Sequence, residues 1–447
     1  MFHKILIANR GEIAVRIIRA CREMGIATVA VYSEADKDSL HAMLADEAIC
    51  IGPAASSESY LNMESILSAT VATKADAIHP GFGFLSENSK FVTLCEKCNI
   101  KFIGPSAEVI ERMGNKSMAR NTMIAAGVPV VPGTKEPVYD VETGKKMAET
   151  IGYPIMIKAA SGGGGKGMRI ARNAEEFETH FLNAQRESIS GFSDDTMYLE
   201  RYVENPRHIE FQILADEYGN VVHLGERDCS IQRRHQKLIE ESPCAVLSPK
   251  LRKEMGEAAV KAAKAAGYVN AGTIEFLLDK HNHYYFIEMN TRIQVEHGVT
   301  EMVTGLDLIK EQIRIASGEK LSFCQEDVVI RGHAIECRIN AEDPSRHFMP
   351  CPGTVTSLHF PGGNGIRVDS AIYSGYQIPP FYDSMIGKLM VHDVDRSSAI
   401  RKMMSALGEV IVEGVTTNVD FQFSILEYEK FQSGHIDTGF IEENFDD

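Results

Sequence analysis

Polar and apolar residues alternate after a strongly apolar segment in the second half of the chain, and this alternation constrains the fold more than any other feature. The polar members are Glu288, Asn290, Arg292, Gln294 and Glu296. In an extended chain, every second side chain lies on the same face. Burying that face without partners would be costly, and the apolar segment before it does not suit a solvated edge strand. We therefore predict that this face borders a cleft that holds a metal or a ligand.

The same segment begins in the second strand of a predicted β-hairpin, at residues 284–289, whose first strand covers residues 271–278. Glu275 on the first strand can then join Glu288 and Asn290. Oxygen ligands of this kind suit Mg²⁺, which binds through one or two carboxylates together with nucleotide phosphates. The hairpin therefore predicts a magnesium site beside a nucleotide.

A glycine-rich segment at residues 161–167 connects an expected strand at 153–159 to another at 168–171. Glycines allow the backbone to approach a polyphosphate closely and to turn several N–H groups toward it. Lys158 and Lys166 add positive charge. The segment is not a P-loop, because neither Ser or Thr nor a helix follows its lysine. The alternative, a flexible linker, is disfavoured by the flanking lysines.

A basic cluster stands out at residues 226–237, where five of twelve residues are Lys, Arg or His in a chain of net charge −16. A solvated charged loop is the usual explanation of such a run. This run follows an apolar strand, so we favour an anion-binding site. The overall acidity opposes binding to nucleic acid or to an anionic membrane surface, and any anionic ligand must meet a local cluster of this kind.

Composition also predicts where the protein resides. The longest stretch without Asp, Glu, Lys or Arg, residues 347–366, contains three prolines and four glycines and is therefore no membrane span. No export signal is visible at the start. Nine cysteines, an odd number, do not resemble a disulfide framework. We expect a cytoplasmic protein.

The first part of the chain has the pattern of a parallel α/β domain. A strand at residues 4–8, a helix at 13–24 and a strand at 28–32 form a βαβ unit, and another strand ends at residue 79 before Pro-Gly. Ligands of open α/β sheets bind at such strand ends. We therefore expect a doubly wound domain up to about residue 113.

Nine segments follow one another along the chain in the order of a known family: IANRGEIAVRIIRA, HPGFGFLSEN, FIGPS, MGNKSMAR, IKAASGGGGKGMRI, ERDCSIQRRHQK, FIEMNTRIQVEH, ECRINAEDP and YDSMIGKL. In these segments the chain resembles the biotin carboxylase components of acetyl-CoA carboxylase and of similar biotin-dependent carboxylases, members of the ATP-grasp superfamily. The resemblance implies an α/β and α+β fold with three domains: a doubly wound N-terminal domain at 1–113, an ATP-grasp domain at 114–330 with a mobile lid at about 130–203, and a C-terminal α+β domain at 331–447.

The resemblance also implies a set of site residues. The ATP-binding positions are Lys116, Lys158, Gly163, Gly164, Gly165, Glu200, Val203, His208, Gln232, His235, Glu275 and Glu288. The metal ligands are Glu275, Glu288 and Asn290. The bicarbonate and biotin positions are Lys237, Arg292, Gln294, Val295, Glu296 and Arg338.

The implied reaction joins ATP and bicarbonate into carboxyphosphate and then carboxylates N1′ of biotin. Bicarbonate is a poor nucleophile and must meet a negative γ-phosphate, so Lys237, Arg292 and a divalent cation are expected to cancel charge. Glu296 is expected to remove the bicarbonate proton. Arg338 is expected to stabilise the biotin enolate oxygen.

The same resemblance implies ATP, Mg²⁺ or alternatively Mn²⁺, bicarbonate, and biotin on a separate carrier protein, together with a carboxyltransferase component. It places a homodimer interface on the helix face of Arg16, Arg19 and Glu23, for which a solvated ion-pair face is the alternative. The final acceptor, acetyl-CoA, pyruvate or another acyl-CoA, is open. Two further alternatives are an ATP-grasp ligase with an amine acceptor and a catalytically silent nucleotide-binding protein.

Two positions depart from the family pattern. Gly298 stands where the family usually has Pro, which loosens the backbone beside Glu296, and Phe82 stands where Tyr is common. Neither change removes a catalytic group. We expect Gly298→Pro to keep or improve activity.

Overall fold

The computed structural model describes residues 1–159, 168–192 and 194–445. These residues divide into two compact units, one of residues 1–128, 207–276 and 288–447, the other of residues 129–206 and 277–287. The second unit covers the segment predicted as a lid and also includes a hairpin tip, 277–287, which the sequence did not assign to it.

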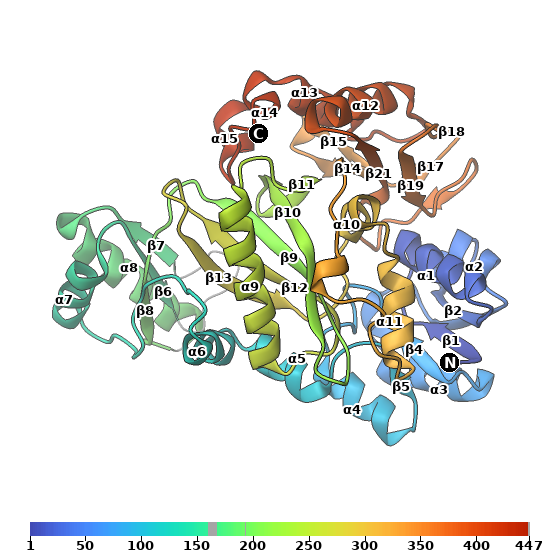
Figure 1. The fold of residues 1–447 in the computed structure, drawn as a ribbon, viewed down its shortest axis with the longest axis horizontal. Coiled ribbons are helices and arrows are strands. Elements are labelled where there is room, and N and C mark those ends of the chain that lie inside the picture. Colours follow the sequence, from blue (N-terminus) through green and yellow to red (C-terminus); the bar gives the residue numbers. More distant parts are fainter. Residues whose placement is uncertain (160–167, 193, 446–447) are drawn as a thin grey trace. The chain divides into compact units, whose positions relative to one another are not determined.

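The first unit begins with the doubly wound domain that the sequence predicts (Figure 1). Its parallel sheet has the order β3-β2-β1-β4-β5. Alternate residues of β1 enter two separate cores: Ile5 and Ile7 pack with α1, whereas Leu6 packs on the other face. Both faces of this sheet are therefore covered. The bounds are β1 Lys4–Ile7, α1 Gly11–Glu23, β2 Ala27–Ser33, β3 Glu47–Gly52, β4 Ala77–His79 and β5 Lys101–Phe102.

The order of this sheet reverses between β1 and β4, which creates a crevice at their carboxyl ends. The loops that follow these strands contain Asn9 and Pro80, and the Asn9 side chain donates a 2.6 Å hydrogen bond to the Pro80 carbonyl. The helices beside the sheet are α2 Leu40–Leu44, α3 Met63–Thr73, α4 Ser89–Lys97 and α5 Ala107–Gly114, and the next helix, α6 Lys116–Ala126, packs against α5 and against α9, Pro249–Ala266.

A second sheet of eight strands carries most of the functional residues, in the order β13-β12-β9-β10-β11-β14-β21-β19. It runs without interruption from the predicted ATP-grasp domain into the predicted C-terminal domain, because β11 pairs with β14 in antiparallel fashion. The bounds are β9 Arg207–Ala215, β10 Val221–Arg233, β11 Gln236–Ser242, β12 Asn270–Leu278, β13 Tyr284–Asn290, β14 His333–Asn340, β19 Ile366–Ser370 and β21 Met385–Asp393.

Helices cover this sheet in two groups. The helix α9, Pro249–Ala266, lies along β9 and β10 (Figure 1). It begins where the Ser248 hydroxyl accepts a bond from the Leu251 N–H, and it ends at Gly267 with φ +62°. Over β14 and β21 pack α12 and α13. The remaining helices and these two have the bounds α10 His297–Thr304, α11 Leu308–Ala316, α12 Arg396–Glu409, α13 Val419–Glu427, α14 Glu429–Gln432 and α15 Phe440–Asn444.

Short strands complete the C-terminal part as three two-stranded sheets, β15 with β16, β17 with β20 and β18 with β22. They connect the longer elements around the core that α12 and β21 share. Their bounds are β15 Glu342–Asp343, β16 Met349–Pro350, β17 Gly353–Thr354, β18 Ser357–His359, β20 Gln377–Ile378 and β22 Ile411–Glu413.

The second unit contains a three-stranded sheet of order β7-β6-β8 with α7 and α8. Antiparallel pairing of β6 with β7 confirms the predicted hairpin, while its glycine-rich tip, including Gly163, Gly164 and Gly165, lies outside the described residues. The tip 277–287 joins this unit through a bond from the Phe286 N–H to the Pro129 carbonyl. The bounds are α7 Val141–Ile151, β6 Ile155–Ala159, β7 Met168–Ala171, α8 Ala174–Phe192 and β8 Met197–Arg201.

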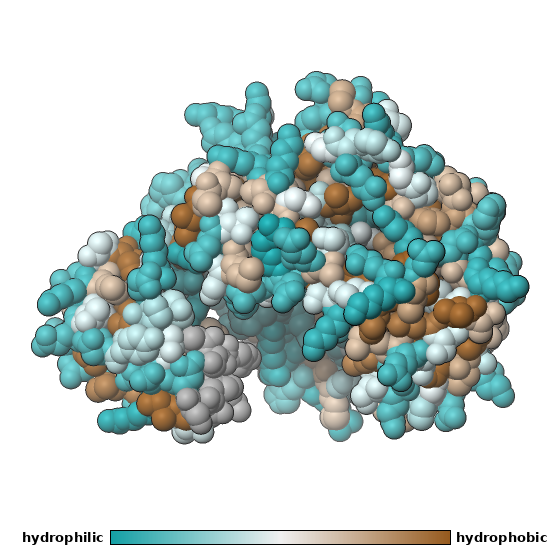
Figure 2. Space-filling view, turned by 90° about the horizontal axis from the view of Figure 1, so that it is seen from below, coloured by the Kyte–Doolittle hydropathy of each residue, from teal (hydrophilic) through white to brown (hydrophobic). Residues whose placement is uncertain are grey.

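The surface mixes hydrophilic residues with small groups of hydrophobic ones on the face that Figure 2 shows. Within the described part of the chain, no helix has the length and apolar character needed to cross a membrane. All nine cysteines are free thiols.

Candidate active site

The predicted polar ladder is extended only as far as Asn290, where β13 ends. Residues 291–296 form an irregular loop, and Glu296 is the N-cap of α10. Glu87 draws the loop out of the strand direction, because its carboxylate accepts bonds from the Thr291 N–H at 3.1 Å and from Arg292 Nε at 2.8 Å. The expectation of one continuous extended face was therefore wrong beyond Asn290.

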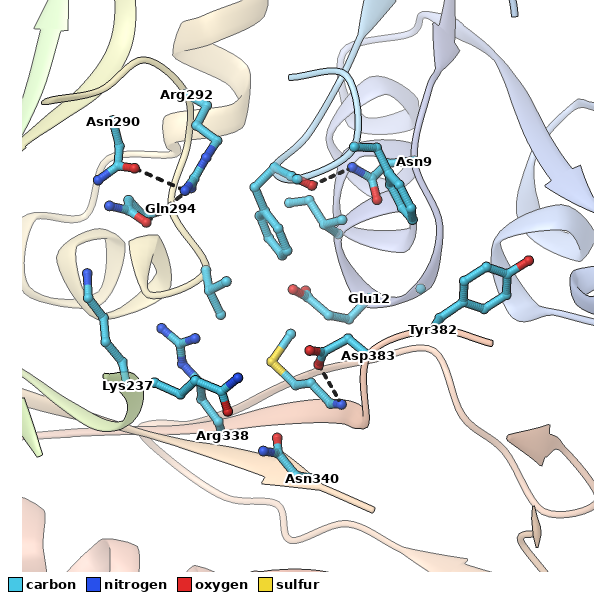
Figure 3. Close-up of a pocket in the computed structure, with 18 of the residues that line it drawn as sticks. Asn9, Glu12, Lys237, Asn290, Arg292, Gln294, Arg338, Asn340, Tyr382 and Asp383 are labelled. Atoms are coloured by element: carbon cyan, nitrogen blue, oxygen red, sulfur yellow. Dashed lines mark hydrogen bonds between the residues drawn. The ribbon is translucent and has the colours of Figure 1, made fainter. Parts of the chain in front are cut away.

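The loop nevertheless delivers the predicted side chains to one place, a cavity of about 740 Å³ within the first unit. In Figure 3, Asn290, Arg292 and Gln294 enter it from one side, Lys237 and Arg338 from the sheet, and Glu12 from α1. The predicted residues that line the cavity are His208, His235, Lys237, Glu275, Glu288, Asn290, Arg292, Gln294, Val295 and Arg338.

Glu275 is the centre of the polar contacts in this cavity. Its carboxylate accepts hydrogen bonds from Asn290 Nδ2 at 2.6 Å, from Gln294 Nε2 at 2.8 Å and from Lys237 Nζ at 3.2 Å. His208 Nε2 lies 2.7 Å from the same carboxylate. Burial alone would raise the pKa of Glu275, but the charges of Lys237 and His208 outweigh it and hold this pKa well below its usual range. Glu275 is therefore ionised.

Glu288 faces the cavity without a hydrogen bond or ion pair to any described residue. Burial raises the pKa of Glu288, and the like charge of Glu275 raises it further. The positive charge of Lys116, at the start of α6, lowers this pKa. Glu275 and Glu288 are thus neighbouring carboxylates, and Glu288 forms no ion pair with a described residue. Such a pair suits a divalent metal. Asn290 fits less directly, since its Nδ2 bonds Glu275 and its Oδ1 accepts a 3.0 Å bond from Arg292.

Glu296 is fully buried beside the cavity and is held by two cations. Lys237 Nζ donates to its Oε1 at 2.7 Å, and Arg338 Nη2 donates to its Oε2 at 3.0 Å. Although burial acts to raise it, the pKa of Glu296 lies well below its usual range because of Lys237, Arg338 and the nearby Arg227. The structure thus provides an ionised carboxylate between the two predicted substrate-binding cations.

The basic cluster is part of the sheet, not a solvated loop. Strand β10 continues to Arg233, and a tight turn at Arg234 and His235, with φ +48° and +64°, leads into β11. Of the cluster's five cationic side chains, His235 and Lys237 line the cavity. Arg233 lies over the Phe348 ring at 4.0 Å. The predicted anion site therefore includes His235 and Lys237 but not the whole cluster.

Sequence reasoning missed the buried pair of Arg227 and Glu210. Arg227 Nε donates to Glu210 Oε1 at 2.5 Å and its Nη1 donates to Gln212 at 2.8 Å, so it is an internal ion partner and no ligand for an anion. Glu210 also accepts a 2.6 Å bond from Lys237 and thereby fixes the lysine from behind. A signal existed, because His208, Glu210 and Gln212 alternate along β9 in the same manner as the residues of β13.

The remaining predicted nucleotide residues are distributed over both units. In the first unit, Gln232 Nε2 bonds His208 Nδ1 at 2.7 Å and orients this ring toward Glu275. In the second unit, Lys158 on β6 and Glu200 on β8 form an ion pair, and Val203 follows β8. Since β6 and β8 are paired strands, this ion pair is formed within one sheet.

The helix face proposed for dimer contacts is partly used inside the chain. Arg16 is buried and donates to Glu301 at 2.9 Å and to Asp307 at 2.7 Å. Glu23 pairs with Lys310 at 2.6 Å. Arg19 is exposed. Arg16 therefore joins α1 to the helices that follow the loop.

Met390 fills the space beside Gly298, the position that departs from the family residue. A Cβ at position 298 would lie 2.2 Å from Met390 Sδ, and Met390 is fully buried. The backbone itself accepts proline, since residue 298 lies in the first turn of α10. The expectation that Gly298→Pro keeps or improves activity stays a prediction, and the structure adds a packing cost that the sequence did not indicate.

Gly298→Pro is expected to lower the free energy of unfolding by about 1–3 kcal/mol, the usual cost of overpacking a buried site. Adding Met390→Val is expected to restore much of this loss, because the shorter side chain frees the occupied space. Urea unfolding of both variants, with Met390→Val alone as the matched control, measures the effect. Wild-type stability of Gly298→Pro would show that Met390 moves aside without cost.

Known proteins resemble the chain along its whole length. Residues 1–110 match the family model described as biotin carboxylase, N-terminal domain, residues 115–324 that of the carbamoyl-phosphate synthase L chain, ATP binding domain, and residues 336–443 that of the biotin carboxylase C-terminal domain. Biotin carboxylase 1 of Bacillus subtilis is 58% identical over 99% of this chain and 98% of its own length. A pyruvate carboxylase component of Methanothermobacter thermautotrophicus is 56% identical over 99% of this chain and 90% of its own length.

Solved structures of biotin carboxylases are also similar to this chain. The biotin carboxylase domain of a thermophilic 2-oxoglutarate carboxylase bound to bicarbonate is 50% identical, with a TM-score of 0.95, over 99% of this chain and 98% of that one. The dimer of this domain from Hydrogenobacter thermophilus, solved with MgADP, ADP and bicarbonate, is 51% identical, with a TM-score of 0.90 and the same coverage. A biotin carboxylase from Campylobacter jejuni, in a nucleotide complex, is 52% identical, with a TM-score of 0.92, over 99% of both chains.

Proposed function

The chain belongs to the biotin carboxylase family, and on this premise we propose which of its residues carry out each step. It is an ATP-dependent ligase that carboxylates biotin with bicarbonate, and it has the expected ATP-grasp fold. The observation that supports the residue roles best is the buried, ionised Glu296 between Lys237 and Arg338, next to the carboxylates of Glu275 and Glu288.

In the first step, we propose that Lys237 and Arg292 bind bicarbonate and cancel charge while its oxygen attacks the γ-phosphorus of ATP. Glu296 removes the bicarbonate proton as this bond forms, which yields carboxyphosphate and ADP. The low pKa of Glu296 keeps it ready as a base at neutral pH. Lys237 is held in place by Glu210 as well as by Glu296, so it stays oriented when substrate replaces one of these contacts.

Glu275 and Glu288 are the residues that would hold Mg²⁺, or alternatively Mn²⁺. The cation, when bound, supplies positive charge to the nucleotide phosphates. The proposed nucleotide contacts of this chain are the remaining predicted ATP residues, with Lys158, Glu200 and Val203 contributed by the second unit. Asn290 orients Glu275 through its amide N–H, and its carbonyl, which accepts a bond from Arg292, would be the atom that holds the metal.

In the second step, carboxyphosphate decomposes to CO₂ and phosphate, the phosphate accepts the N1′ proton of biotin, and N1′ forms a bond to the carbon of CO₂. Arg338 stabilises the enolate oxygen that develops on the ureido group. Its guanidinium is oriented in advance, because Nε donates a 2.6 Å bond to Glu240 and Nη2 donates to Glu296. Arg338 therefore connects the base of the first step to the substrate of the second.

Arg338→Ala is expected to depress biotin carboxylation far more than bicarbonate-dependent ATP hydrolysis, because only the second step requires its contact with biotin. Some loss of ATP hydrolysis is expected too, since Glu296 loses one of its two cations. The ratio of carboxybiotin formed to phosphate released measures the split. A variant that loses both activities in equal proportion would show that Arg338 serves the first step.

The overall assignment is tested by phosphate release from ATP with the purified chain, Mg²⁺ and free biotin. We expect release that requires bicarbonate and rises with biotin. ATP hydrolysis that responds to an amine acceptor but not to biotin would instead identify a different ATP-grasp ligase. No bicarbonate-dependent release from folded protein would identify a silent nucleotide-binding protein.

The partners are proposed from the family. The biotin substrate is carried by a separate carrier protein, and a carboxyltransferase component uses the product. A homodimer is supported by the dimer of the related 2-oxoglutarate carboxylase domain, and the exposed Arg19 suits that interface better than the buried Arg16. The relative named for pyruvate carboxylase is nearly as similar to this chain as the one named biotin carboxylase 1, so the final acceptor stays open. A cytoplasmic location stays a prediction.

A further inference from the structure

One face of the strand pair β14–β21 forms a platform under the loop that carries Glu296. In the antiparallel register, Arg338 lies opposite Lys388, and Glu336 lies opposite Met390. Opposite residues of an antiparallel pair share a face, as do residues two apart on one strand. Arg338, Lys388 and Met390 therefore point to the same side, where each meets a different part of the segment 295–298.

Lys388 makes the central contact of this platform. Its Nζ donates a 2.7 Å hydrogen bond to the carbonyl of Val295, the residue directly before Glu296. The nearest carboxylates are farther away, Glu12 at 3.4 Å and Asp369 at 3.9 Å. The ammonium thus lies closer to a neutral backbone carbonyl than to either acid.

The surroundings keep this lysine charged although its side chain is fully buried. Burial alone would lower the pKa of Lys388, but Glu12, Glu336 and Asp369 outweigh it and raise this pKa. A buried charge requires partners, and here the acids stabilise the cation while the short bond goes to the loop. The hydrogen bond to Val295 is therefore charge-assisted, which makes it stronger than a neutral one.

Two cations from neighbouring strands thus restrain two successive residues of an otherwise irregular loop. Arg338 holds the side chain of Glu296, and Lys388 holds the backbone one residue earlier. Side-chain contacts alone would leave the peptide between residues 295 and 296 free to rotate. The bond from Lys388 restricts this rotation. The restrained peptide joins Val295, a proposed bicarbonate contact, to Glu296, the proposed base.

We propose that Lys388 is a positioning residue for the first half-reaction, which sets the orientation of Val295 and Glu296 through the Val295 carbonyl. This inference rests on the function proposed above. A displacement of about 1 Å in a catalytic group lowers rates by about 10²-fold. Lys388 itself does not line the cavity, so it acts through the loop and not by contact with substrate.

The test compares Lys388→Met, which keeps most of the side-chain volume and removes the donor, with Asp369→Asn, which removes an acid partner that does not line the cavity and leaves the bond to Val295 intact. Lys388→Met is expected to raise the KM for bicarbonate and to lower bicarbonate-dependent kcat, together about 10²-fold in kcat/KM, with the KM for ATP nearly unchanged. Asp369→Asn is expected to stay within a few fold of wild type in every constant. Amide hydrogen exchange of residues 291–298 is expected to accelerate in Lys388→Met alone.

Because Lys388→Met leaves Glu12 without its cation, the double variant with Glu12→Gln is also measured. The hydrogen-exchange result addresses Lys388 even if the wild-type chain showed no bicarbonate-dependent turnover, which would be a failure of the proposed function instead. The inference is overturned if the loop exchanges at the wild-type rate in the folded variant. It is overturned equally if all kinetic constants fall together with stability, or if neither variant folds, since Lys388 would then be a structural ion partner only.

Discussion

Glu288→Gln is expected to abolish ATP turnover, with a loss on the order of 10³-fold, because a bound divalent cation contributes several kcal/mol of charge stabilisation in phosphoryl transfer. The variant keeps the shape of the side chain and removes the one carboxylate of the pair that has no cation among the described residues. Burial and the like charge of Glu275 raise the pKa of Glu288, and a metal bound there would balance that charge. Steady-state phosphate release over a range of Mg²⁺ concentrations measures the effect.

The matched control is Glu254→Gln, which neutralises a half-exposed carboxylate on α9 away from the cavity and is expected to leave turnover unchanged. If Glu288 acts through the metal, a high Mg²⁺ concentration is expected to restore part of the activity of Glu288→Gln. The control Glu254→Gln is expected to keep the wild-type activity. Full activity of Glu288→Gln at ordinary Mg²⁺ concentration would remove Glu288 from the metal site.

Glu296→Ala is expected to lower bicarbonate-dependent turnover by about 10²- to 10⁴-fold, the usual contribution of a general base. The affinity for ATP is expected to change little, because Glu296 lies behind Lys237 and is not among the predicted nucleotide contacts. Pre-steady-state phosphate release separates the chemical step from nucleotide binding. Glu296→Gln is the matched variant, since it keeps the volume and one of the two acceptor oxygens that bind Lys237 and Arg338, while it removes the charge and the second oxygen.

The pH profile distinguishes this base from others. Lys237 and Arg338 hold the pKa of Glu296 well below its usual range against the effect of burial, so Glu296 is ionised at neutral pH. Loss of activity between pH 8 and pH 5 is therefore not expected to come from Glu296, and Glu296→Gln is expected to keep the shape of the wild-type profile at a lower rate. Wild-type turnover in Glu296→Ala would exclude it from the mechanism.

Local patterns predicted much of the fold because they reflect local physics. The first βαβ unit, the hairpin around the glycine-rich segment and the helix that ends at Gly267 follow from hydrophobic period, turn residues and capping. The alternation of polar residues from 288 to 296 predicted side chains that do meet at the cavity. The reason given for it, one continuous extended strand, was wrong. Beyond Asn290, the chain turns because Glu87, some two hundred residues earlier, binds Thr291 and Arg292.

The sequence by itself determined the family, the residue types of the site and the need for a cavity beside β13, since each depends on which side chains occur and in what order. Only the tertiary structure decided their chemical state. Glu296 is ionised because Lys237 from β11 and Arg338 from β14 converge on it, and Arg227 is an internal partner because Glu210 lies across the β9–β10 pair. The contact of Lys388 with Val295 and the packing of Met390 against Gly298 likewise join residues about ninety positions apart. Contacts over such separations leave no periodic trace in the chain, because they depend on how strands pair and not on the spacing along one of them.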